Sequence, residues 1–530
     1  MNNDVARFSV PGGESAARRH VVCILVSLAY LSVWPYFQLI NNPNENVRAF
    51  MTRAIVEHHT LAIDRVYAEW GYVDDKATSN RHLYSSKAPG TSLLGVPALW
   101  VQTNLWHAFG WPSPTKRATI FALRLLTVMP CAILFLFAFA RWVERRTQSP
   151  AARDFLLVGL GLGTLLYPYG ILFVGHAQAA LAAFGAFMAL SWPRPAGDSA
   201  PPAARRLAGA GALAGAAVVF EYQLHLVAVA LAGYAAWRFR GRVMWFALGA
   251  LPLVILLGAY HTALFGRPWE FPYGYLENQT YASVHHGSGF FGLGAPQMDA
   301  LGSSLFSVSY GLFVFSPFLL VGLGVSLRRL IRPPRAEAVV ILVASAALSL
   351  FLAGMTHWRA GWCVGPRYIA GIAPLLAAGI ALDWKIFAGE GPRPTWLRAA
   401  LGGLIAVSVF LNGVSAATYP HYPEDYDNPV FDLALPLWRD GYVPYGLGHA
   451  LGLPRLWALV PVALLWLVAI GIAIVTGARR PREALGRLGA ALLVAVVVLT
   501  PLALYGRKPS PAEQHATAAV RSLWEPARRP

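Results

Sequence analysis

Long apolar stretches separated by shorter polar segments recur along nearly the whole chain. The first covers residues 21-40, and later ones lie near 118-140, 155-170, 175-192, 207-221, 223-237, 243-262, 304-325, 337-355, 368-384, 399-416, 457-476 and 488-505. A transmembrane helix needs roughly 20 mostly apolar residues. The pattern therefore predicts an all-α polytopic membrane protein with about 13 transmembrane helices, the shortest stretches lying at the lower limit for crossing.

Composition supports this fold class and limits the partners. The chain has 530 residues, of which 56% are hydrophobic and only 13% charged, too apolar for a soluble protein of this size. Its net charge of +17 is explained by Lys and Arg in cytoplasmic loops, so we expect membrane lipids and no nucleic acid as partners. Cys23, Cys131 and Cys363 lie in different segments and indicate neither a disulfide framework nor a metal site.

Basic clusters mark alternate connections and set the predicted orientation. Residues 1-20 and segments such as "RWVERRTQSPAARD" and "RRPREALGR" are predicted to be cytoplasmic. The first apolar stretch is too long for a signal peptide and is predicted to be an uncleaved anchor. One membrane domain, 21-505, then presents loops 41-89, 263-303, 356-367 and 417-454, and the tail 506-530, on the outer face of the inner membrane.

The segment 91-108 is apolar but conflicts with this orientation. A full crossing there would place Arg141, Arg145 and Arg146 outside. We therefore expect it to dip into the outer leaflet, with a true span as the alternative.

The loop after the first stretch begins "NNPNENVRAFMTRAIVEHHT". Apolar residues recur at helical spacing from Val47 to Val56, which predicts an amphipathic helix on the membrane surface. Glu45 and Arg48 stand one turn apart at its start. A carboxylate near a helix N-terminus also has a purely structural use, as a capping group paired with Arg48. Further on, Lys87 in "YSSKAPGTSLL" is either an interfacial anchor or a ligand.

The order of these parts resembles the GT-C superfamily of membrane glycosyltransferases, in particular the group of protein O-mannosyltransferases and lipid A aminoarabinose transferases. In that group an Asp-Glu pair opens the first outer loop, Lys-Pro-Pro closes it and Arg-Leu-Pro begins the next span. Glu45 matches the Glu, whereas Asn44 stands where the Asp is expected. Lys87 matches the lysine that faces the donor phosphate. Ala88 and the residue after Leu125 depart from the motifs, and beyond about residue 190 the resemblance concerns topology only.

The resemblance implies an inverting transfer of a sugar from a polyprenyl-phosphate donor to a lipid, glycan or protein acceptor outside the membrane. Such a transfer needs a carboxylate to accept the proton of the acceptor hydroxyl and cations to stabilise the departing phosphate. We expect Glu45 to be the base, Arg48 to orient it and Asn44 to hold the acceptor. The sugar, the acceptor and the oligomeric state stay open. No cofactor is indicated, although a divalent metal is possible.

Two further outer loops supply candidate ligands. Arg367 and Tyr368 stand on the side where Arg is disfavoured, and they suit a phosphate and a sugar face. His285 and His286 are adjacent polar residues in a loop rich in Gly and aromatics, with solvated surface as the alternative. We predict that the loops 41-89, 265-303 and 356-368 together form an outward-facing cavity.

Glu221 and His176 stand near the outer ends of apolar stretches, where ionisable groups are either functional or interfacial. A transporter or flippase of lipid-linked sugars, using these two residues and Arg124 along a central path, is one alternative function. A non-catalytic relative, suggested by Asn44, is another. Asp74-Asp75 and the segment "HYPEDYDNP" (421-429) are predicted to be solvated loops.

Overall fold

The computed structural model describes residues 16–37, 39, 41–193, 202–286, 292–333, 335–388, 392–505 and 509–524. These residues form helices almost throughout, and their one sheet is a two-stranded hairpin. The predicted all-α fold class is therefore confirmed.

The helices and strands follow in chain order. They are α1 Ala16–Leu31, α2 Pro43–His58, α3 Asp64–Trp70, β1 Lys76–Ser79, β2 His82–Ser85, α4 Gly90–Ala108, α5 Lys116–Leu123, α6 Met129–Thr147, α7 Pro150–Leu162, α8 Leu166–Gly170, α9 Gly175–Ser191, α10 Ala204–Phe220, α11 His225–Phe239, α12 Val243–Phe265, α13 Gln279–His286, α14 Met298–Phe306, α15 Leu312–Phe315, α16 Phe318–Arg329, α17 Arg335–Gly354, α18 Ala373–Leu382, α19 Pro392–Ala416, α20 Leu435–Arg439, α21 Leu447–Ala450, α22 Val460–Val475, α23 Pro481–Leu504 and α24 Pro511–Ser522.

Apolar helices long enough to cross a bilayer account for much of the molecule. Within the described ranges these are Lys116–Thr147, Tyr222–Phe265, Arg335–Gly354, Thr395–Ala416, Arg455–Val475 and Pro481–Leu504, with shorter apolar helices at Arg19–Leu31 and Arg367–Leu382. The chain is therefore a multi-pass membrane protein. Some predicted stretches are interrupted: α1 ends before Pro35, which has no N–H for a helical hydrogen bond, and 304-325 is divided among α14, α15 and α16.

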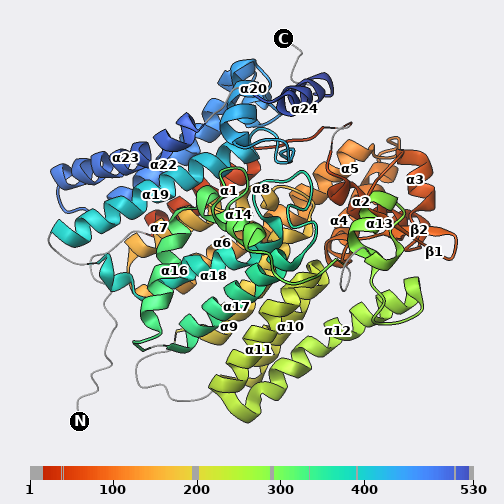
Figure 1. The fold of residues 1–530 in the computed structure, drawn as a ribbon, viewed down its shortest axis with the longest axis horizontal. Coiled ribbons are helices and arrows are strands. Elements are labelled where there is room, and N and C mark those ends of the chain that lie inside the picture. The colour runs from red at the N-terminus through yellow and green to blue at the C-terminus, as the bar shows by residue number, and fades with distance from the viewer. Residues whose placement is uncertain are drawn as a thin grey trace.

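The elements that follow the first stretch gather at one end of the molecule. Figure 1 shows α2, α3, α4, α5, the hairpin and α13 together there, while α19, α22 and α23 lie side by side along another edge. Helices α10 and α12 pack closely and reach towards the first group, so that the end of α10 and the end of α12 approach α2 and the hairpin.

The polar face that an amphipathic surface helix would expose is largely buried in α2. Eleven residues from Asn44 to Ala54 are buried, because α2 packs against α4 on one side and a small apolar core on another. The contact with α4 is close: Thr52 Oγ1 donates to the Ser92 carbonyl at 3.1 Å, and Ser92 Oγ donates to the Arg48 carbonyl at 3.1 Å. Its polar residues therefore face other parts of the protein and not water.

Candidate active site

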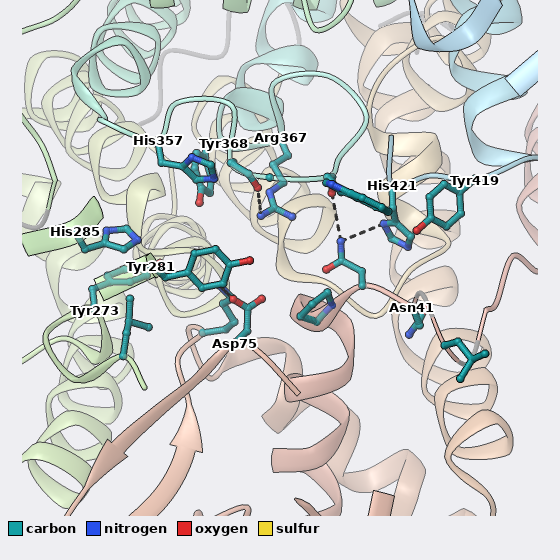
Figure 2. A pocket seen from close by; sticks show the side chains of 18 residues that line it. Asn41, Asp75, Tyr273, Tyr281, His285, His357, Arg367, Tyr368, Tyr419 and His421 are labelled. Atoms are coloured by element: carbon teal, nitrogen blue, oxygen red, sulfur yellow. Dashed lines mark hydrogen bonds and ion pairs between the residues drawn. The ribbon is translucent and has the colours of Figure 1, made fainter. Parts of the chain in front are cut away.

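The three loops predicted to form the site line one cavity of about 340 Å³, and a fourth loop joins them through Tyr419 and His421. Figure 2 shows their side chains converging from several elements. The lining residues are Leu39, Asn41, Asn42, Pro43, Asp75, Lys87, Tyr273, Leu276, Tyr281, His285, His357, Ala360, Gly361, Trp362, Arg367, Tyr368, Tyr419 and His421.

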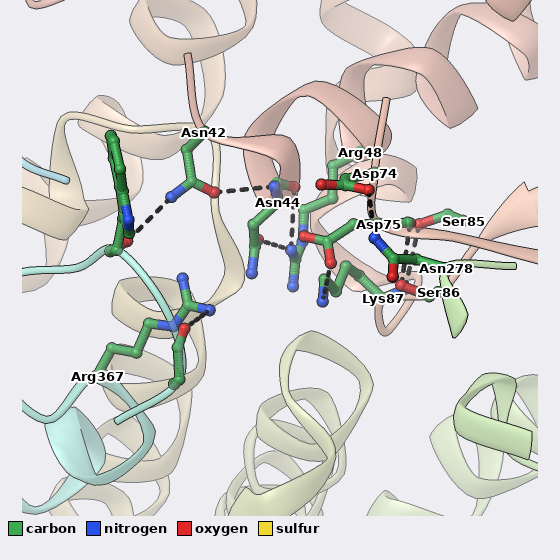
Figure 3. Close-up of polar contacts among 12 residues, drawn as sticks. Asn42, Asn44, Arg48, Asp74, Asp75, Ser85, Ser86, Lys87, Asn278 and Arg367 are labelled. Carbon is green, nitrogen blue, oxygen red and sulfur yellow. Dashed lines mark hydrogen bonds and ion pairs between the residues drawn. The ribbon is translucent and has the colours of Figure 1, made fainter. Parts of the chain in front are cut away.

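The hairpin places an acidic and a basic side chain of the cavity, Asp75 and Lys87, beside each other. Asn80 and Arg81 both have positive φ, 50° and 65°, as in the two-residue turns that join antiparallel strands. Because β1 and β2 pair in register, the residue before β1 and those after β2 lie together. Ser86 Oγ donates to the Asp75 carbonyl at 2.9 Å, and Lys87 Nζ lies 2.9 Å from Asp75 Oδ1 (Figure 3). Local strand pairing thus builds this ion pair.

Two cations line the cavity. The side chains of Lys87 and Asp75 are only 14% and 16% exposed. Burial lowers the pKa of the Lys87 ammonium; the Asp75 carboxylate opposes this, and the nearby Arg367 and Arg48 guanidinium groups add to it. Arg367 Nη2 donates to the Ala360 carbonyl at 2.6 Å, whereas its Nε has no hydrogen-bond partner in the described part of the chain. An anion in the cavity would satisfy both cations.

An apolar cavity of about 440 Å³ adjoins the polar one. The two share Tyr273, His285 and Tyr368, and the His285 ring stacks on Tyr273 with centroids 4.9 Å apart. The remaining wall comes from α10, α11, α12, α17 and the segments next to them, and it includes Val218, Leu226, Leu257, Leu293, Phe351 and Met355. A polar and an apolar cavity in contact suit a ligand with a charged head and a hydrocarbon tail.

Glu45, which the sequence analysis predicts to be the general base, does not face the cavity. Its side chain is fully buried and does not line the cavity. Arg124 Nε and Nη2 donate to its two oxygens at 2.6 and 2.5 Å, the Phe173 N–H donates at 2.7 Å and Asn41 Nδ2 at 3.1 Å. Burial alone would raise the pKa of the Glu45 carboxyl, but the charge and hydrogen bonds of Arg124, together with the Phe173 N–H, hold that pKa below its ordinary value. A carboxylate so occupied is a poor general base.

The expected pairing of Arg48 with Glu45 is also wrong. Arg48 Nη2 instead donates to Glu221 Oε1 at 2.7 Å, and its Nη1 donates to the side chain of Asn44. His176 Nδ1 lies 3.4 Å from the same Glu221 oxygen. These four residues are buried behind the cavity wall and do not line it, so they cannot contact a substrate there directly. They support the wall, since the His176 ring packs against Tyr368.

Neither a family model nor a curated protein matches the chain. Solved structures similar to it include ArnT from Cupriavidus metallidurans bound to undecaprenyl phosphate (16% identity, TM-score 0.44, covering 92% of this chain and 77% of that one). They also include the arabinosyltransferase EmbB from Mycobacterium smegmatis (12% identity, TM-score 0.43, covering 98% of this chain and 44% of that one). A third is the apo oligosaccharyltransferase of Archaeoglobus fulgidus (11% identity, TM-score 0.43, covering 81% of this chain and 59% of that one).

Sequence reasoning missed two lining residues by treating their loops as solvated. Asp75 faces the cavity, and His421 is buried with Asn42 Nδ2 3.1 Å from its Nδ1. The strand pattern around Asn80 contained a signal for Asp75, because a hairpin there brings Asp75 next to Lys87. No local signal marks His421, because its hydrogen-bond partner, Asn42, lies hundreds of positions away in the sequence.

The predicted histidine pair is only partly described. His285 lines both cavities, whereas the side chain of His286 lies outside the described residues. Among the residues that are described, no group of three or more His, Cys, Asp and Glu side chains is arranged to hold a metal ion.

Proposed function

We propose that this chain is a GT-C-type glycosyltransferase that moves a sugar from a polyprenyl-phosphate donor to a lipid, glycan or protein acceptor on the outer face of the inner membrane. The observation that carries the proposal is one cavity in which Asp75 faces Lys87 and Arg367, directly beside an apolar cavity among membrane helices.

The cations bind the leaving group. A polyprenyl phosphate develops negative charge as its bond to the sugar breaks, and preorganised donors in a water-poor site stabilise that charge strongly. Lys87 supplies an ammonium group and Arg367 a planar guanidinium with an unpartnered Nε. The first units of the lipid would enter the apolar cavity past Tyr273 and Tyr368, so that the phosphate stays between the cations.

Asp75 replaces Glu45 as the proposed general base. It is the one carboxylate on the described lining of the polar cavity. In the proposed step the acceptor hydroxyl oxygen attacks the anomeric carbon, its proton passes to Asp75, and the bond from that carbon to the phosphate oxygen breaks with inversion. Once the donor phosphate engages Lys87, the ion pair with Asp75 loosens and frees a carboxylate oxygen to accept the proton.

The far end of the cavity suits the acceptor. Trp362 is 40% exposed there, beside Tyr419, and aromatic faces pack well on the C–H face of a sugar. By contrast, the residues that a flippase would need along an open path are buried: Glu221 and Arg124 lie in ion pairs, and His176 lies beside Glu221. This arrangement favours transfer over transport.

The test measures consumption of labelled polyprenyl-phosphate sugars by the purified protein with mixed hydroxylated acceptors. Asp75→Asn is expected to slow turnover by about 10²–10⁴-fold, as for loss of a general base. Lys87→Ala and Arg367→Ala should each raise the barrier by roughly 2–4 kcal/mol.

Asp74→Asn is the matched control. Asp74 Oδ1 accepts from Tyr72 at 2.7 Å and from Asn278 at 2.8 Å, it does not line the cavity, and an amide oxygen can keep both bonds. This variant should turn over like wild type. Wild-type rates in Asp75→Asn would remove Asp75 as the base. Failure of the wild-type protein to consume any lipid-linked sugar would contradict the proposed function as a whole.

A further inference from the structure

A second large cavity, of about 620 Å³, lies among α1, α6 and α7, far from the candidate active site. Four arginines line it: Arg19 on α1, Arg141 and Arg145 on α6, and Arg153 on α7. The only carboxylate in its described lining is Glu144. The cavity therefore carries an excess of positive charge.

The two sites lie at opposite ends of one long helix. Lys116–Thr147 is continuous, with Arg124 at the active-site end holding Glu45 and Arg141 about 25 Å further along the axis. No charged residue occurs between them. Because the hydrocarbon core of a bilayer is about 30 Å thick, the arginine cavity opens at the membrane surface opposite the active site.

The positive charge in the cavity is only partly neutralised. Glu144 lies 3.5 Å from Arg19 and 3.7 Å from Arg153, and Arg153 also pairs with Asp154 at 2.8 Å. In the described ranges no carboxylate lies within ion-pair distance of Arg141 or Arg145. Both side chains are exposed. These two guanidinium groups are thus the ones available to an added anion.

The cavity is also graded in polarity. Phe137 and Cys23 line it one helical turn deeper than Arg141 and Arg19, on the same faces of α6 and α1. A charged rim over an apolar floor fits a molecule with a phosphate at the membrane surface and hydrocarbon beneath it. A soluble phosphate would leave the apolar floor unused. We propose that this cavity binds an anionic phospholipid, its phosphate between Arg141 and Arg145 and an acyl chain against Phe137.

The experiment measures retention of added phosphatidylglycerol by the purified full-length protein in native mass spectrometry, with phosphatidylcholine as the zwitterionic comparison. Each basic side chain near a membrane surface contributes about 1 kcal/mol to the binding of anionic lipid. Arg141→Gln with Arg145→Gln should therefore weaken phosphatidylglycerol binding by roughly 30-fold. Arg332→Gln with Arg335→Gln, which removes the same charge from two exposed positions outside the cavity, should bind like wild type.

Thermal unfolding in the same detergent supplies the second measurement. The unliganded Arg141/Arg145 variant should melt like wild type, since both side chains are exposed, and phosphatidylglycerol should stabilise wild type but not the variant. Equal binding by this variant and its control overturns the proposal, as does equal binding of phosphatidylcholine. Stabilisation by inorganic phosphate as large as that by the lipid would assign the cavity to a soluble anion instead.

Discussion

At the scale of single residues, His421 illustrates how burial fixes a protonation state. Asn42 Oδ1 accepts the Asn44 N–H at 2.8 Å, so the Asn42 amide nitrogen is the group that faces His421 Nδ1. The ring nitrogen must then be an unprotonated acceptor. Burial lowers the pKa of His421 to about 3; the Glu45 carboxylate only partly opposes it, while Arg124 and Arg367 add to it. The imidazole is therefore neutral at ordinary pH.

This pKa predicts a pH dependence of stability. In the unfolded chain a histidine titrates near pH 6.5, so below that value the unfolded state binds a proton that the folded state does not. The contribution of His421 to the free energy of unfolding is complete above about pH 6.5. It is lost, at up to about 1.4 kcal/mol per pH unit, as the pH falls towards 3.

Unfolding in detergent at about pH 7.5 and about pH 5.5 measures the effect. His421→Gln should show a smaller loss of stability between the two values than wild type. His515→Gln, a substitution of an exposed histidine, should keep the wild-type dependence. An identical loss in wild type and His421→Gln would show that His421 does not titrate as predicted.

At the scale of elements, the contact between α10 and α12 depends on glycine. A Cβ on Gly211 would overlap the carbonyl of Phe246, and a Cβ on Gly249 would overlap the carbonyl of Ala208. Small residues let membrane helices approach this closely. The contact matters for the site, because α10 leads directly into Glu221, which holds Arg48.

Gly211→Ala should therefore destabilise the protein by about 1–3 kcal/mol, the usual cost of overpacking, since the obstacle is backbone that cannot rotate away. At Gly209, two residues earlier on the same helix, an added Cβ would meet no atom within 4 Å. Gly209→Ala should leave stability unchanged or raise it by up to about 1 kcal/mol, because alanine is the better helix former. Melting temperatures of the two variants in detergent give the comparison, and equal values would contradict close packing at Gly211.

At the scale of the whole molecule, the two ends of the described chain lie on opposite sides. Arg19 lines the arginine cavity, whereas Trp524 packs on Phe37 at 4.5 Å and near Tyr419, which lines the candidate active site. Together with the basic clusters, this predicts a cytoplasmic N-terminus, a tail beyond Tyr505 outside the membrane and an odd number of crossings. Topology reporters fused to each terminus measure this. A C-terminal reporter active only in the cytoplasm would reverse the assignment.

The sequence by itself determined the helical membrane fold and three of the four loops that form the cavity. Hydrophobic runs of membrane length can satisfy their backbone only as helices, so the class follows from local composition. The loops at 41-89, 265-303 and 356-368 stood out because they are the long polar connections between such runs. Lys87 was identified from the motif resemblance and Arg367 from residue type and position, and both line the cavity.

Only the tertiary structure decided which charges pair and which stay accessible. Glu45 and Arg48 are one turn apart in sequence, yet each is neutralised by a residue far away in the chain, Glu45 by Arg124 and Arg48 by Glu221. A buried charge left unpaired costs several kcal/mol, so such partners are set by packing and not by spacing along the chain. Asp75 is different because its partner is close in the chain. The hairpin holds Asp75 in the cavity wall beside Lys87, which also faces the cavity.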